Sequence, residues 1–110
     1  MKVYVGHRTE EHDWVVTLVA PGTGASAALN PRFDLRRHSP DGFSWGYSGS
    51  GPAQLALALC ADVLNDDERA QNIYQRFKDQ VVAVLDQDAD WTLSEVVIRE
   101  QIELIAKEGP

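Results

Sequence analysis

The sequence predicts an α+β domain in which a small antiparallel sheet from the N-terminal half packs against three C-terminal helices. Residues 3–8 alternate in polarity and residues 14–19 are rich in β-branched side chains, and both patterns are typical of strands. Residues 52–107 instead carry helix-start signals followed by apolar residues at helical spacing. A chain of 110 residues, 44% of them hydrophobic, fits one domain over residues 1–110.

The N-terminal segment is typical of an antiparallel hairpin. Val3 and Val5 point to one face of the first strand and Tyr4 points to the other. The polar residues 9–13 supply the connecting turn, and a Pro- and Gly-rich stretch at 21–24 ends the second strand.

Residues 25–51 contain prolines and glycines that interrupt any long regular element. We expect short strands near Arg32–Leu35 and Phe43–Tyr47, the second because three aromatic residues alternate onto one face. Core packing is the expected role of these aromatic residues, and stacking on nucleic-acid bases is the alternative.

The first helix is expected over residues 52–64, with Pro52 at its start and Asn65 at its end. It is apolar nearly all round, so we expect it to be the buried centre of the fold. Asp66 or Asp67 is expected to cap a second helix, because both side chains can accept from its first free N–H groups.

The third helix is predicted to begin at a capping box formed by Thr92 and Glu95, to reach about Lys107, and to stop at Gly109 and Pro110. Helical spacing also predicts which residues of the three helices lie in the core. These predicted core residues are Leu55, Leu59, Ile73, Phe77, Val81 and Ile98.

The charge distribution limits the classes of partner. The formal net charge is -7, so a basic footprint for nucleic acid is absent overall and nucleic acid is not an expected partner. Residues 1–40 carry five basic and four acidic residues, whereas residues 41–110 carry five basic and thirteen acidic ones. Solvated helix faces are one explanation for the acidic half, and a surface for a basic partner is the other.

The sequence also bears on the cell compartment. No apolar run is long enough to span a membrane, and the first residues are too short and polar for a signal peptide. Cys60 is the single cysteine, which excludes an internal disulfide framework. We therefore expect a cytoplasmic protein that does not bind membranes.

One run of the chain is highly specific. Residues 43–59 read Phe-Ser-Trp-Gly-Tyr-Ser-Gly-Ser-Gly-Pro-Ala-Gln-Leu-Ala-Leu-Ala-Leu, and they are preceded by Tyr-x-Gly-x-Arg at residues 4–8. Together with Asp66–Ala70 and Tyr74–Lys78, this run resembles a family of small uncharacterised proteins in bacterial, archaeal and mobile-element genomes. The resemblance covers most of the chain.

The resemblance implies a fold and not an activity. Ser48 stands where glycine is expected and Arg37 where asparagine is expected, and residues 20–30 look like an insertion. The mobile-element distribution of the similar proteins favours a small accessory protein over an enzyme.

The Gly-rich turn before the first helix is the strongest candidate for a ligand site. Free N–H groups and the positive end of a helix dipole suit an anion such as phosphate or a nucleotide. A structural explanation is stronger, because glycines permit a tight turn and Ser50 can cap the helix. The residues of this anion-binding hypothesis are Arg8, Arg36, His38, Gly49, Ser50 and Gly51.

Other chemistry finds little support in the sequence. His7, His12 and His38 have no metal-site spacing, and the sequence implies no metal and no cofactor. Ser39 beside His38 lacks a nucleophile elbow, and Cys60 is expected to be an inert core thiol. We therefore assign no catalytic residue.

The third helix has apolar residues on two sides, which predicts that a partner or a second copy covers one of them. A non-enzymatic interaction module that uses its acidic helical half is thus the first functional hypothesis, with self-association as a homodimer. Anion or nucleotide binding at residues 49–52 is the alternative. The predicted partner-binding residues are Ile98, Glu100, Ile102, Glu103 and Ile105.

Overall fold

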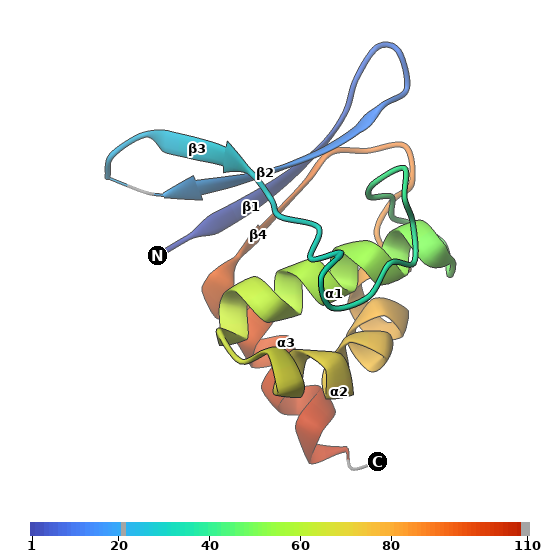
Figure 1. The fold of residues 1–110 in the computed structure, drawn as a ribbon. Helices are drawn as coiled ribbons and strands as arrows, with labels where there is room; N and C mark the ends of the chain where they lie inside the picture. Colours follow the sequence, from blue (N-terminus) through green and yellow to red (C-terminus); the bar gives the residue numbers. More distant parts are fainter. Residues whose placement is uncertain (21, 109–110) are drawn as a thin grey trace.

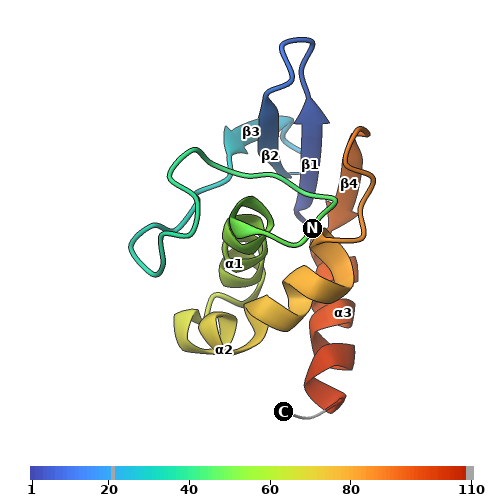
Figure 2. The ribbon, with the colours of Figure 1, turned by 90° about the vertical axis from the view of Figure 1, so that its right-hand side faces the viewer.

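The computed structural model describes residues 1–20 and 22–108, and it confirms the predicted α+β fold (Figure 1). A four-stranded antiparallel sheet in the order β3-β2-β1-β4 lies on one side, and the helices lie on the other (Figure 2). None of the helices in these residues is both long and apolar enough to cross a membrane. The elements are β1 Val3–Arg8, β2 Trp14–Ala20, β3 Ala25–Ala28, α1 Ser50–Leu64, α2 Asp67–Phe77, the π-helix η1 Lys78–Val82, β4 Trp91–Ser94 and α3 Glu95–Lys107.

The predicted hairpin is confirmed. β1 pairs antiparallel with β2 in a register that places Val3 opposite Val19 and Arg8 opposite Trp14. The inward residues of β1 are Tyr4 and Gly6, which are buried against the helical layer. The stretch predicted to end β2 begins at Pro21, which lies outside the described residues.

The two outer strands were not predicted. β3 falls in the stretch that looked like an insertion, and it pairs with β2. β4 pairs with β1 and occupies the position predicted for the cap of the last helix. Thr92 is therefore a strand residue, and Ser94 caps α3 by accepting a hydrogen bond from Val97 N at 3.1 Å. Trp91–Ser94 forms a strand because its backbone hydrogen-bonds to the free edge of β1. The local sequence does not reveal this long-range pairing.

The strands predicted near Arg32–Leu35 and Phe43–Tyr47 are wrong, because both segments are irregular loop. Arg32 has φ 59° and Gly46 has φ 85°, and neither value is compatible with a strand. Trp45 nevertheless has no exposed surface, so the core role expected of the aromatic residues holds for it.

α1 forms the centre of the fold, as its apolar composition predicted. It lies between the sheet and the pair α2 and α3 (Figure 2). Cys60 in this helix is buried, and burial raises the pKa of its thiol far above the ordinary value. Asn65 ends the helix in the left-handed conformation with φ 50°, as predicted. Pro52 is buried in the first turn, two residues after the start.

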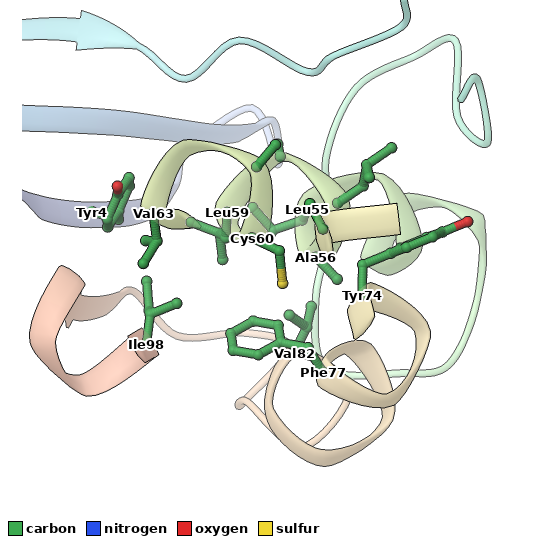
Figure 3. Close-up of a cluster of buried hydrophobic side chains, with 14 of the residues drawn as sticks. Tyr4, Leu55, Ala56, Leu59, Cys60, Val63, Tyr74, Phe77, Val82 and Ile98 are labelled. Atoms are coloured by element: carbon green, nitrogen blue, oxygen red, sulfur yellow. The ribbon is translucent and has the colours of Figure 1, made fainter. Parts of the chain in front are cut away.

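α2 packs on α1 and continues directly into the π-helix. Asp66 caps α2 by accepting from Arg69 N at 3.0 Å, which confirms one of the two predicted caps. Phe77 and Val82 point toward Cys60 in the core (Figure 3). Val81, predicted to be core, is only half-buried, because the wider π-turn advances the buried position by one residue to Val82. The remaining predicted core residues are confirmed as buried, namely Leu55, Leu59, Ile73, Phe77 and Ile98.

A stack of three tryptophans joins the sheet to the loop before α1. The rings of Trp14 and Trp45 meet edge to face at 4.7 Å, and those of Trp45 and Trp91 at 5.5 Å. Trp45 Nε1 donates to Ala89 O at 3.2 Å, and Gly46 N donates to Val82 O at 3.1 Å. The loop over residues 43–49 is thereby fixed to the segment that leads into β4.

Gly46→Ala is predicted to destabilise the protein more than Gly42→Ala does. Both glycines have positive φ, so a side chain at either costs about 1–2 kcal/mol in backbone strain. At Gly46 a Cβ would also lie 2.5 Å from Gln87 Cα, whereas at Gly42 it would meet nothing within 4 Å. The collision should add about 1–3 kcal/mol, measured by urea unfolding of both variants. Equal losses would show that the contact with Gln87 is not tight.

Candidate functional site

The turn at the start of α1, predicted as an anion site, is packed against its own loop. Gly49 is the N-cap residue, and no side chain caps the helix, so the expected cap by Ser50 is wrong. Ser50 is instead the first helical residue. A Cβ on Gly51 would lie 1.8 Å from Ser44 Oγ, and one on Gly49 would lie 2.6 Å from the Tyr47 ring. These glycines are explained by the close approach of the loop.

Arg8 contacts β2 and the segment that leads into β4. Its guanidinium lies 3.7 Å from the centroid of the Trp14 ring, and its Nη1 donates to Gln87 O at 2.7 Å. Arg8 is thus held by packing of its planar group on the Trp14 ring. Its Nε is buried and has no hydrogen-bond partner among the described residues.

Arg36 and His38 belong to a loop that a single side chain holds in place. Gln54 on α1 is fully buried, accepts from His38 N at 2.8 Å and donates to Arg36 O at 3.0 Å. Its amide also accepts from Ser39 N and donates to Pro31 O. The signal for this role was a lone amide in an apolar helix, because such a group must find partners when it is buried.

The remaining contact of His38 is a 2.6 Å hydrogen bond between its Nε2 and the Tyr74 hydroxyl. The Arg36 side chain is exposed to solvent. Arg8, His38, Gly49 and Gly51 thus have contacts within the chain that explain them, and anion binding at residues 49–52 stays a prediction.

A polar cleft of about 740 Å³ lies at the other end of α1. Asp62 is its central group: it accepts from the buried Tyr4 hydroxyl at 2.5 Å and from Lys2 Nζ at 3.1 Å. Burial, followed by the bond to Asp62, raises the pKa of Tyr4 far above its ordinary value, so this hydroxyl stays protonated and donates. The cleft is lined by Lys2, Asn30, Arg32, Asp34, Ala58, Ala61, Asp62, Val63 and Asn65.

Arg32 forms one wall of this cleft and is held by two carboxylates. Its guanidinium donates to both oxygens of Asp34, each at 3.0 Å, and to both oxygens of Asp67, at 3.0 and 2.8 Å. The bond from Arg32 lowers the pKa of the Asp34 carboxyl. The guanidinium is therefore engaged in ion pairs and is not directed into the cleft as a free cation. Sequence reasoning missed this cleft, since its residues come from three separate segments of the chain.

The described residues contain no group of three or more His, Cys, Asp or Glu side chains placed to hold a metal ion. His7 instead pairs with Asp90 at 2.9 Å on the rim of the sheet. Asp90 also accepts from Arg8 N at 2.9 Å, and this bond, followed by the one to His7, lowers its pKa.

The predicted partner-binding residues divide between the core and the surface. Ile98, Ile102 and Ile105 have no exposed surface, so they pack inside this chain and are not available for a partner. Their spacing of three and four residues places them together on the side of α3 that faces α1 and α2. Glu100 and Glu103 are exposed on the other side, and their role in binding a partner stays a prediction.

The outer side of α3 carries a shallow groove of about 520 Å³. Val96 is 47% exposed and Leu104 is 54% exposed along it. Glu103 is held at one side by Arg69 at 2.9 Å, and this bond lowers the pKa of its carboxyl. The lining residues are Val96, Arg99, Glu100, Glu103, Leu104 and Lys107.

Comparison with known proteins gives a match to one family. A family model described as a family of unknown function, DUF6166, matches residues 4–104. A search of curated proteins and a search of solved structures gave no match.

Gln54→Leu is predicted to destabilise the protein by about 2–4 kcal/mol. Leucine has a similar size, but it leaves two partly buried N–H groups and two carbonyls of the loop over residues 31–39 without their partner. Urea unfolding and amide exchange of His38 and Ser39 measure the effect. Gln75→Leu, at an exposed site on α2, is the matched control and should change stability little.

Stability is predicted to fall as the pH drops below about 4. The pKa values of Asp34, Asp90 and Glu103 are lowered in the folded state, so their stabilisation is complete above the ordinary carboxyl pKa and is lost as the pH falls through the lowered values. Asp90→Asn should reduce this dependence in melting curves from neutral to acid pH. Asp41→Asn, in an exposed turn, should not, and an equal effect of both would contradict the assignment.

Proposed function

We propose that this chain, which belongs to the DUF6166 family, is a non-enzymatic interaction module that binds another polypeptide through the outer side of α3. The observation that carries the proposal is the set of apolar side chains left in solvent along this helix. Val96, Val97 and Leu104 are 47%, 40% and 54% exposed, although α3 already buries three isoleucines in the core.

Two of the exposed apolar residues, Val96 and Leu104, lie on one side of the helix together with charged residues. Val96, Glu100, Leu104 and Lys107 recur at spacings of three and four, which places them in a row on one face. A row of this kind can accept a partner segment in a groove, with Val96 and Leu104 as apolar anchors and charged side chains between and beside them.

The charges along the groove favour a partner with basic residues. Glu100 stands between Val96 and Leu104 and has no ion-pair partner among the described residues. Residues 41–110 carry thirteen acidic and five basic residues, so the helical half attracts positive charge over a longer range. We therefore expect a partner that presents apolar side chains flanked by lysine or arginine.

The ion pairs of the polar cleft support a structural role for its residues over acid–base catalysis. The Arg32 guanidinium forms ion pairs with Asp34 and Asp67. Asp62 accepts a hydrogen bond from Tyr4 and forms an ion pair with Lys2. Groups that act as a general acid or base need a proton that they can exchange with a substrate. In the polar cleft, the ion pairs of Arg32 and the hydrogen bonds of Asp62 instead connect separate segments of the chain, which supports a structural role.

A photo-crosslinking amino acid at Leu104 is predicted to trap the partner in cells that express the protein. Val84 is the matched control, because it is 72% exposed and lies in the turn that follows the π-helix instead of on α3. Mass spectrometry identifies the adduct. An equal pattern of adducts from both positions would contradict a specific surface on α3.

With the trapped partner in hand, Leu104→Asp and Glu100→Lys should each weaken binding by about tenfold or more. Val84→Asp and Glu10→Lys introduce the same changes elsewhere and should leave the affinity unchanged. Unfolding curves verify that the variants fold. One result would replace this proposal with the anion site. In that result, neither Leu104→Asp nor Glu100→Lys weakens binding, phosphate raises the melting temperature of the protein, and Arg36→Ala removes that rise.

A further inference from the structure

Among the described residues, the helices lie on one side of the sheet and leave its other side uncovered (Figure 1). The strand register places one set of side chains on that side, because paired residues in neighbouring strands point the same way. This outer sheet face consists of Val3, Val5, His7, Val15, Thr17, Val19, Ser26, Ala28, Thr92 and Ser94.

The outer sheet face lacks formal charge, although the chain has ten basic and seventeen acidic residues. No Asp, Glu, Lys or Arg belongs to the set of residues that defines it in the described strands. His7 lies at its rim, where it pairs with Asp90 at 2.9 Å. The charges of this acidic chain are therefore carried by its other surfaces.

Four valines give the outer sheet face an apolar centre. In the register, Val3 lies beside Val19, and Val5 lies between Thr17 and Thr92. Val15, opposite His7, is 42% exposed. An antiparallel sheet with one side in water normally alternates between apolar inward and polar outward residues. β1 and β2 depart from that pattern, since their outward positions are mostly valine.

We propose that a second copy of this chain docks on the outer sheet face, sheet against sheet. Two copies that each carry a charge of -7 repel one another, and an uncharged face is where they can approach without placing like charges together. A partner of opposite charge would find no group to pair with there. A face of valine and threonine is self-complementary, as a two-fold interface requires.

The expected geometry is that of two aligned sheets about 10 Å apart, with the valines of both copies forming the contact. The strands are short, with four to seven residues each, so the contact is smaller than that of a tight dimer. We therefore expect a dissociation constant on the order of 100 µM. The predicted homodimer is in this way assigned to β1 and β2 and not to the last helix.

The test is sedimentation equilibrium of the full chain from about 10 to 500 µM. The wild-type protein should move from monomer to dimer mass over this range. Val5→Lys should weaken the association at least about tenfold, because it places a positive charge from each copy in the contact. Val5→Thr, which keeps the β-branched shape and adds no charge, should retain most of it.

Variants on other surfaces separate this proposal from binding through α3. Leu104→Asp should leave the dimer unchanged, and so should Val84→Lys. A wild-type chain that stays monomeric over the whole range would overturn the proposal. A dimer lost in Leu104→Asp and kept in Val5→Lys would overturn it as well, since the contact would then lie on α3.

A second measurement does not depend on the folding of a variant. Dilution of the wild-type protein should shift the amide NMR signals of β1 and β2 residues in the outer sheet face. Signals of α3 should stay in place. Dilution shifts confined to α3, or no shifts at all, would contradict the proposed contact.

Discussion

The fold depends on the need to surround a helix that has no polar face. Twelve of the fifteen residues of α1 are buried, so every side of this helix requires a covering element. The sheet covers one side, α2 and α3 cover another, and the irregular segment over residues 29–49 closes the rest. Each large apolar side chain buried in this way contributes about 1.5–3 kcal/mol. Gln54, the polar residue among the buried residues of α1, then determines the path of the loop because its amide bonds to four backbone groups there.

Elements that depend on local pattern were predictable, and those that depend on distant contacts were not. Periodicity located the β1–β2 hairpin and all three helices, and Asp66 and Asn65 marked a start and an end correctly. β4 was missed because Trp91–Ser94 becomes a strand only beside β1, more than eighty residues earlier in the chain. The shift from Val81 to Val82 follows from a π-turn, which single residues do not signal.

The candidate sites show the same division. Glycines at 49 and 51 suit both an anion site and a close backbone approach, and the contacts with Tyr47 and Ser44 account for them by packing. The sequence of α3 showed apolar residues on two sides of the helix, so one side was predicted to bind a partner. The residues chosen for that side were wrong, because residues 98, 102 and 105 face the core. The outward valines of β1 and β2 were visible as strand formers. Only the position of the helices shows that one side of the sheet is left uncovered.

The strand order has a consequence for the growing polypeptide on the ribosome. β1 is made first, yet it is an inner strand whose second neighbour, β4, is made about eighty residues later. Until then the nascent hairpin presents one edge of β1 with unpaired N–H and C=O groups. The Trp91 indole and the capping hydroxyl of Ser94 arrive together with that strand, so closing the sheet and starting α3 are one event. The start of α3 is therefore coupled to the pairing of the free edge of β1 with β4.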